Sequence, residues 1–143
     1  MAKTDSNLPT TEELLRNPVL QNALEEAWKD SLPNDVNLRH EEGGWVYFDP
    51  TTSRVEVRRA MPGVLAAIDL SGPLTIAGFY VVATFHTHPN PSAEGWEMGP
   101  SDQDASSALS LGVPCFIRAE DGIHTTGPDR RRGGLSGNPG FPQ

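Results

Sequence analysis

The run GFYVVATFHTH, residues 78–88, carries the strongest structural signal in the sequence. Its residues are almost all β-branched or aromatic, a composition that favours a strand buried on both faces in the middle of a sheet. On a strand, residues i and i+2 point to the same side, so His86 and His88 are expected to project into one space while Thr87 faces the other way. The run therefore predicts a central strand that ends in a pair of histidines.

The segments before this strand predict a helical N-terminal part and a hairpin. Thr10 and Glu13 have the spacing of a capping box, and Asn17 with the following proline offers a second helix start, so helix is expected to about residue 31. The stretch GGWVYFDPTTSRVEVRRA at 43–60 has two β-rich runs around a turn and predicts a hairpin. The next stretch, 61–75, is ambiguous between a short helix and a strand.

The segments after the central strand complete an α/β pattern. SDQDASSALSLG at 101–112 begins with a serine suited to an N-cap and ends with a glycine, so a short helix is expected there. VPCFIRA and GIHTTG, at 113–119 and 122–127, predict two more strands. Helix, hairpin, central strand, helix and strands together indicate an α/β layer fold with mixed strand directions.

Length and composition predict one domain and exclude some partners. A chain of 143 residues is close to the commonest size of a single domain. We place that domain at residues 10–128, between a disordered N-terminus at 1–9 and an irregular Gly/Pro-rich tail at 129–143. The net charge of -8 argues against nucleic acid or an anionic membrane as the main partner.

Cysteine usage and the distribution of apolar residues predict a soluble cytoplasmic protein. The single cysteine, Cys115, cannot form an intramolecular disulfide, and its apolar neighbours predict a small buried core residue. The first thirty residues contain no apolar run of the kind that a secretory signal requires. No segment has the apolar length needed to cross a bilayer.

The paired histidines predict a metal site that needs a third ligand from elsewhere in the chain. Asp104, in the first turn of the helix that Ser101 is expected to cap, can supply a carboxylate from a different element. Two imidazoles and one carboxylate leave a fourth tetrahedral position open, which is typical of catalytic zinc, whereas structural zinc sites are closed and rich in cysteine. A base is still needed for proton transfer, and spacing alone does not choose between Glu41 and Glu42.

These residues resemble the motif of the JAMM metallopeptidases, also called JAB or MPN-plus domains. That motif is a glutamate, a later H-[ST]-H-P and then S-x-x-D, and this sequence has HTHP from His86 and SDQD from Ser101. The family's glutamate opens an E-x-x-G pattern before a large apolar residue, which Glu41 with Gly44 and Trp45 fits better than Glu42 does. The resemblance covers roughly residues 36–128.

The resemblance implies a JAB/MPN-like mixed β-sheet flanked by helices, with zinc as the cofactor. It implies that His86, His88 and Asp104 bind the zinc ion, that Glu41 is the general acid and base, and that Ser101 helps to stabilise the oxyanion. A positioned hydroxyl beside a metal suits that last role, because it offers a hydrogen-bond donor where negative charge develops.

One departure from the family pattern concerns the loop after the histidines. Twelve residues, 89–100, lie between His88 and Ser101, which is more than the family usually has. Extra loop length costs little free energy, so the site tolerates it. The loop is expected to border the substrate groove, with Trp96 as either a substrate platform or a local packing anchor.

The function implied by the resemblance is a zinc-dependent metallopeptidase or isopeptidase. Its substrate would be a protein or peptide, and removal of a ubiquitin-like modifier is one form of that activity. Two alternatives stay open: a non-catalytic MPN-type binding or scaffold module, and a small-amide metallohydrolase linked to a bacterial toxin or defence system. The tail sequence RRRGGL resembles the end of ubiquitin-like modifiers, but a basic mobile tail is the interpretation we favour.

Overall fold

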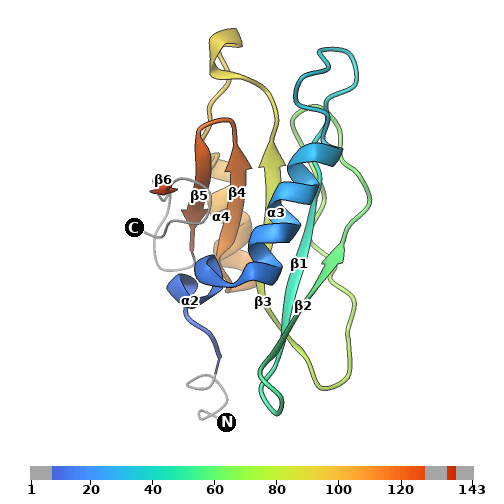
Figure 1. Cartoon of the computed structure of the whole chain (residues 1–143), viewed down its shortest axis with the longest axis vertical. Coiled ribbons are helices and arrows are strands. Elements are labelled where there is room, and N and C mark those ends of the chain that lie inside the picture. The colour runs from blue at the N-terminus through green and yellow to red at the C-terminus, as the bar shows by residue number, and fades with distance from the viewer. Residues whose placement is uncertain (1–7, 128–134, 138–143) are drawn as a thin grey trace.

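A mixed β-sheet forms the middle of the molecule in the computed structural model, which describes residues 8–127 and 135–137 (Figure 1). Within these residues the sheet has six strands in the order β2-β1-β3-β4-β5-β6. Only β3 and β4 pair in parallel, and the other neighbours are antiparallel. The strands are β1 Gly43–Asp49, β2 Arg54–Arg59, β3 Tyr80–His88, β4 Cys115–Ala119, β5 Gly122–Thr126 and β6 Leu135–Gly137.

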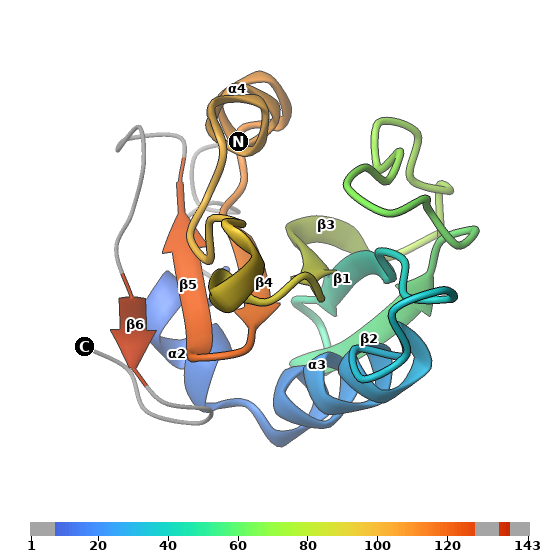
Figure 2. The ribbon, with the colours of Figure 1, turned by 90° about the horizontal axis from the view of Figure 1, so that it is seen from above.

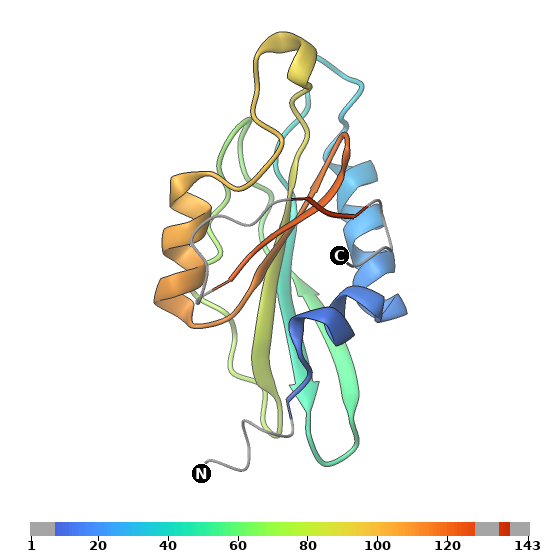
Figure 3. The ribbon, with the colours of Figure 1, turned by 90° about the vertical axis from the view of Figure 1, so that its left-hand side faces the viewer.

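The helices cover both faces of this sheet (Figures 2 and 3). On one face lie α2, Thr11–Arg16, and α3, Pro18–Asp30, and on the other lies α4, Asp102–Leu111. The predicted capping box of Thr10 and Glu13 is present, and the side chain of Asn17 caps α3. The two helices are therefore separate, because each has its own start.

Strand β3 is central, as the sequence predicted. It pairs with β1 on one side and with β4 on the other, and its residues from Val82 to Thr87 are buried. Phe85 packs in the hydrophobic core on the α3 face. Alternation along the strand then places Thr84, His86 and His88 on the opposite face, under α4.

The main core lies between the sheet and the two N-terminal helices. It joins one apolar face of the helix pair to the sheet, through Leu14, Leu15, Leu20, Leu24, Ala27, Val46, Phe48, Val82, Ala83, Phe85, Phe116 and Ile123. By contrast, α4 buries a single residue, Ala108, in a small cluster with Cys115 and Ile117. The sheet is thus anchored on the α3 side, which leaves room for a cavity beneath α4.

The structure corrects the expectations at residues 61–75, in the tail and at Leu8. The stretch 61–75 forms neither helix nor strand: it is an irregular loop with one isolated bridge between Val64 and Ala67. Part of the expected irregular tail forms β6, which pairs with β5. The remaining tail residues, 129–134 and 138–143, and residues 1–7 of the expected disordered N-terminus lie outside the described residues.

The single α/β domain with strands in both directions is confirmed. Leu8, within the segment expected to be disordered, packs against the core. None of the helices in the described ranges has the length and apolar composition needed to cross a membrane.

Candidate metal centre

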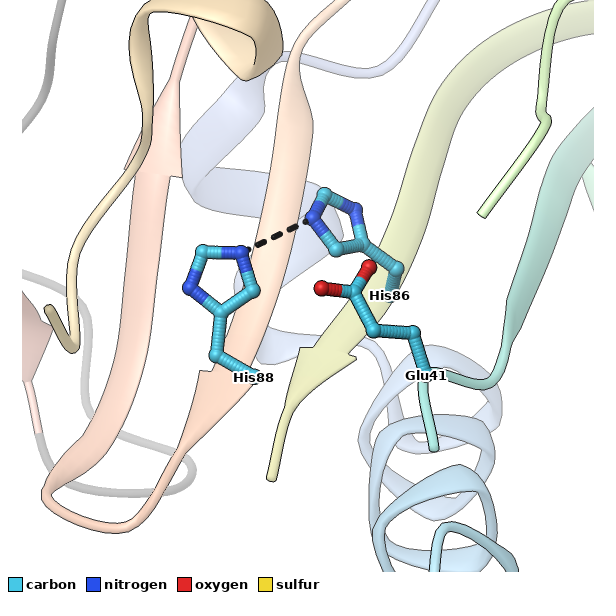
Figure 4. A group of neighbouring side chains, drawn as sticks. All are labelled: Glu41, His86 and His88. Carbon is cyan, nitrogen blue, oxygen red and sulfur yellow. Dashed lines mark hydrogen bonds between the residues drawn. The ribbon is translucent and has the colours of Figure 1, made fainter. Parts of the chain in front are cut away.

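The two histidines at the end of β3 point toward the same space, with Glu41 beside them (Figure 4). Their Nε2 atoms lie 3.3 Å apart, and His86 is only 4% exposed. The start of β1 lies directly against this strand end: a Cβ added to Gly43 would stand 2.2 Å from the carbonyl oxygen of Phe85 and 2.8 Å from Cβ of His86. Glycine is therefore the residue that lets β1 approach the histidines so closely.

Asp104 reaches the same space from the first turn of α4. Its Oδ1 lies 3.2 Å from Nε2 of His86, and its Oδ2 lies 3.2 Å from Nε2 of His88. A capping box fixes the carboxylate: the backbone N–H of Ser101 donates to Oδ2 at 2.9 Å, and the backbone N–H of Asp104 donates to Ser101 Oγ at 3.0 Å. The predicted N-cap is thus confirmed, and the cap also positions the carboxylate.

The spacing of these three side chains fits one small cation. Bonds of about 2.0–2.1 Å from a tetrahedral zinc ion to nitrogen and oxygen place neighbouring ligand atoms about 3.3 Å apart. The two Nε2 atoms lie 3.3 Å apart, and each lies 3.2 Å from its own oxygen of the Asp104 carboxylate, Oδ1 for His86 and Oδ2 for His88. Two nitrogens and a carboxylate are also a donor set that zinc accepts.

A second carboxylate, that of Glu41, lies beside the histidine pair. One ligand atom each from Glu41, His86 and His88 lies within 4.8 Å of the others, and this group can hold a metal ion. Hydrogen bonds of the Glu41 backbone to the 61–75 loop fix its place: its N–H donates to the carbonyl of Val64 at 2.8 Å, and its own carbonyl accepts from Gly63 at 2.8 Å.

Glu42 takes a different direction. Its Oε1 accepts a hydrogen bond from Arg59 at 2.6 Å, and its Oε2 lies 2.5 Å from Nε2 of His40. Both carboxylate oxygens are therefore engaged in a cluster that does not include the histidine pair. Of the two glutamates that the sequence left open, the structure places Glu41 next to the histidines.

Burial, neighbouring charges and hydrogen bonds shift the pKa values of three side chains in the site. Burial raises the pKa of Glu41, and the neighbouring histidines oppose this only in part. Burial also acts to raise the pKa of Asp104, but hydrogen bonds from His86 and His88 outweigh it and hold that pKa well below the usual range. For His86, burial acts to lower the pKa, while Cys115 and Asp104 outweigh it and raise the pKa. Asp104 is therefore ionised, as a metal ligand must be.

All of these side chains open into one cavity of about 1120 Å³. Residues 62–64 and 66–71 line one part of it, and Gln103, Ser107, Ser110 and Leu111 of α4 line another. Thr84 and Cys115 of the sheet line it as well. Trp96 also lines the cavity and is 39% exposed, so it lies where a substrate could contact it.

Two side-chain contacts fasten the loop of residues 89–100, called the insertion loop below. The buried guanidinium of Arg39 donates to both carboxylate oxygens of Glu94 at 2.9 Å. The side-chain amide of Asn90 donates to the carbonyl of Leu65 at 2.9 Å. These contacts tie the insertion loop to the segment before β1 and to the 61–75 loop, and they fix its position relative to the cavity.

Several neighbours of the site have no signal in the sequence. Gly63 and Val64 position Glu41 through backbone bonds, and Arg39 holds the insertion loop. Cys115 lies with its Sγ 3.5 Å from Nδ1 of His86. These contacts join segments far apart in the chain, so no local spacing predicts them; only the buried position of Cys115 was predicted, and it is confirmed by an exposure of 3%.

Comparisons with known proteins identify no relative of this chain: a scan against protein-family models, a search of curated proteins and a search of solved structures each found no match.

Proposed function

We propose that this chain is a zinc-dependent metallopeptidase or isopeptidase of the JAMM type, with the JAB/MPN form of the α/β fold. The observation that carries the proposal is the convergence of the motif residues from three separate segments on one cavity. The histidines come from the end of β3, Asp104 and Ser101 from the start of α4, and Glu41 from the segment before β1.

Zinc would be held by His86, His88 and Asp104. Contacts of 3.2 Å from Asp104 to each imidazole, together with the 3.3 Å between the imidazoles, support this ligand set. Glu41 also lies close enough to the two histidines to share a metal ion with them, and we assign it to proton transfer because it matches the glutamate of the motif. When bound, the ion supplies Lewis acidity toward an amide carbonyl and lowers the pKa of water toward about 7. The three ligands line the cavity, so they would hold the ion within reach of a peptide that enters it.

Glu41 would transfer the proton from the attacking water to the leaving amine. Its carboxylate is buried beside the histidines, and its backbone is pinned on both sides by the 61–75 loop. Burial favours the neutral carboxylic acid, so this group can accept a proton from water and release it to the leaving amine without a large free-energy penalty. Glu42 is unsuited to the role because Arg59 and His40 engage both of its oxygens.

Ser101 would donate a hydrogen bond to the oxyanion that develops on the substrate carbonyl. Its Oγ accepts the N–H of Asp104, so the hydroxyl hydrogen is left to donate. The cap also fixes the hydroxyl beside the Asp104 carboxylate, in the lining of the cavity. A donor that is positioned before the reaction stabilises developing charge without reorganising.

An extended peptide segment is the substrate that the cavity favours. Its volume of about 1120 Å³ exceeds the range of about 300–1,000 Å³ that is usual for small-molecule sites. Residues of α4, the candidate zinc ligands and residues of the 61–75 loop all line the cavity. A protein or peptide substrate, including a ubiquitin-like conjugate, fits this shape better than a small amide does.

The test combines metal analysis with a single substitution. Purified protein is expected to contain one zinc ion per chain, and Glu41→Gln is expected to keep the zinc but to lose hydrolysis of ubiquitin-like fusions and peptide amides. Glu42→Gln is the matched control, since it changes the adjacent carboxylate outside the histidine group and should leave hydrolysis measurable. A zinc-free wild type favours the scaffold alternative, and a fully active Glu41→Gln variant contradicts the assignment of the base.

A further inference from the structure

The side of His86 that faces away from Asp104 has an unusual neighbour. Nε2 of this imidazole faces Asp104 and His88, and its other nitrogen, Nδ1, lies 3.5 Å from Sγ of Cys115. Both residues are buried, with exposures of 4% for His86 and 3% for Cys115. This is hydrogen-bonding distance for sulfur, in a place where water has little access.

A histidine that binds a metal generally donates its second N–H to a carboxylate, a backbone carbonyl or water, and that bond fixes the orientation of the ring. Here a thiol occupies the partner's position. We propose that Cys115 is a positioning residue for His86, whose thiol holds the imidazole with Nε2 directed at the metal site. For its metal-binding part, this inference rests on the proposed function.

The thiol has one property that a carboxylate or a carbonyl lacks. A carboxylate or a carbonyl only accepts hydrogen bonds, whereas a thiol both donates and accepts weakly. Without metal, a neutral His86 can keep its hydrogen on Nε2 and donate to Asp104, and the S–H group then donates to Nδ1; a protonated His86 instead donates from Nδ1 to sulfur. When Nε2 binds a metal, the imidazole hydrogen resides on Nδ1 and donates to sulfur. Cys115 therefore supports the same ring orientation in both tautomers.

The geometry also separates this role from that of a metal ligand. Cys115 lies at Nδ1, whereas the candidate ligand atom of His86 is Nε2, on the other side of the ring. Cys115 belongs to strand β4, which pairs in parallel with β3 and places Cys115 opposite Thr84. The sulfur is thus held behind the imidazole by the sheet itself.

A spectroscopic test follows from the cysteine count. Because the chain has one cysteine, its S–H stretching band in the Raman spectrum reports on Cys115 alone. In metal-free protein we expect this band to differ in frequency or intensity from the band in His86→Leu, since a hydrogen bond between sulfur and Nδ1 perturbs the S–H bond whichever of the two atoms donates. The control His88→Leu should leave the band where the wild type has it. An identical band in wild type and His86→Leu overturns the proposal.

A second measurement uses substitutions of the cysteine itself. Cys115→Ala removes the partner and is expected to weaken zinc affinity about tenfold or more, measured by competition with a chromophoric chelator. Cys115→Ser keeps a group that donates and accepts, and should stay within about threefold of wild type. Ile117→Val is the packing control, because it trims the same small cluster next to His86 and leaves the Cys115 thiol in place.

Each result has a defined meaning. Wild-type affinity in Cys115→Ala overturns the positioning role, and so does an equal loss in Ile117→Val, which would show that packing alone accounts for the effect. If wild-type protein binds no zinc, the proposed function fails, and the Raman comparison of metal-free proteins still decides whether Cys115 bonds to His86.

Discussion

Ser101→Ala separates the structural role of this serine from its proposed chemical role. The side chain caps α4 by accepting the N–H of Asp104 at 3.0 Å. Loss of such a cap costs about 1 kcal/mol of unfolding free energy, which lowers the melting temperature by about 3 to 5 °C for a domain of this size. Loss of a hydroxyl that stabilises an oxyanion lowers kcat about 100- to 1,000-fold, a much larger effect.

Zinc content should be unchanged in this variant. The carboxylate of Asp104 also accepts the backbone N–H of Ser101 at 2.9 Å, and alanine keeps that N–H. The ligand therefore remains tied to the start of α4. A loss of hydrolysis with full zinc content would then originate at the hydroxyl and not at the metal.

The chain offers a matched control for the cap. Thr10 begins α2 with the same capping box, with its side chain 3.1 Å from the N–H of Glu13, and it is not among the residues that line the cavity. Thr10→Ala should lower the melting temperature by a similar amount and leave kcat unchanged. The assay is thermal unfolding beside steady-state hydrolysis of the best wild-type substrate. A Ser101→Ala variant with kcat within about threefold of wild type refutes the oxyanion role.

Three further substitutions or treatments test other parts of the account. Gly43→Ala would place a Cβ 2.2 Å from a backbone oxygen of β3, so we expect loss of soluble folded protein, while Gly72→Ala, with nothing within 4 Å, should fold normally as judged by circular dichroism. Arg39→Ala releases Glu94 and should speed proteolytic cleavage of the insertion loop; unchanged cleavage argues against the clamp. Zinc at about 100 times its Kd should stabilise the metal-free protein by about 2.7 kcal/mol in denaturant unfolding, and chelation should reverse this.

The sequence predicts the elements whose signals are local. The capping box at Thr10, the N-cap at Ser101, the hairpin and the central strand follow from spacing over a few residues, and the structure has them. Alternation along β3 likewise predicts that His86 and His88 share one face. These features depend on residues that are close together in the chain, so the sequence alone is enough to predict them.

The rest depends on contacts between distant segments. Residues 61–75 have no period that distinguishes helix from strand, because their backbone serves the site by bonding to Glu41 instead of pairing in the sheet. For the same reason spacing could not separate Glu41 from Glu42, which only their partners distinguish. Cys115 lies beside His86 because β4 pairs in parallel with β3. No local pattern in the sequence predicts that pairing.

A crystal structure of the zinc-soaked protein, with anomalous diffraction at the zinc edge, is the most direct test that His86, His88 and Asp104 bind one zinc ion. The account predicts a single strong peak bonded to Nε2 of His86, Nε2 of His88 and the carboxylate of Asp104, with Glu41 outside bonding distance. An ion bonded through Glu41 while Asp104 stays unbound, or the lack of any peak at the histidine pair, would contradict it.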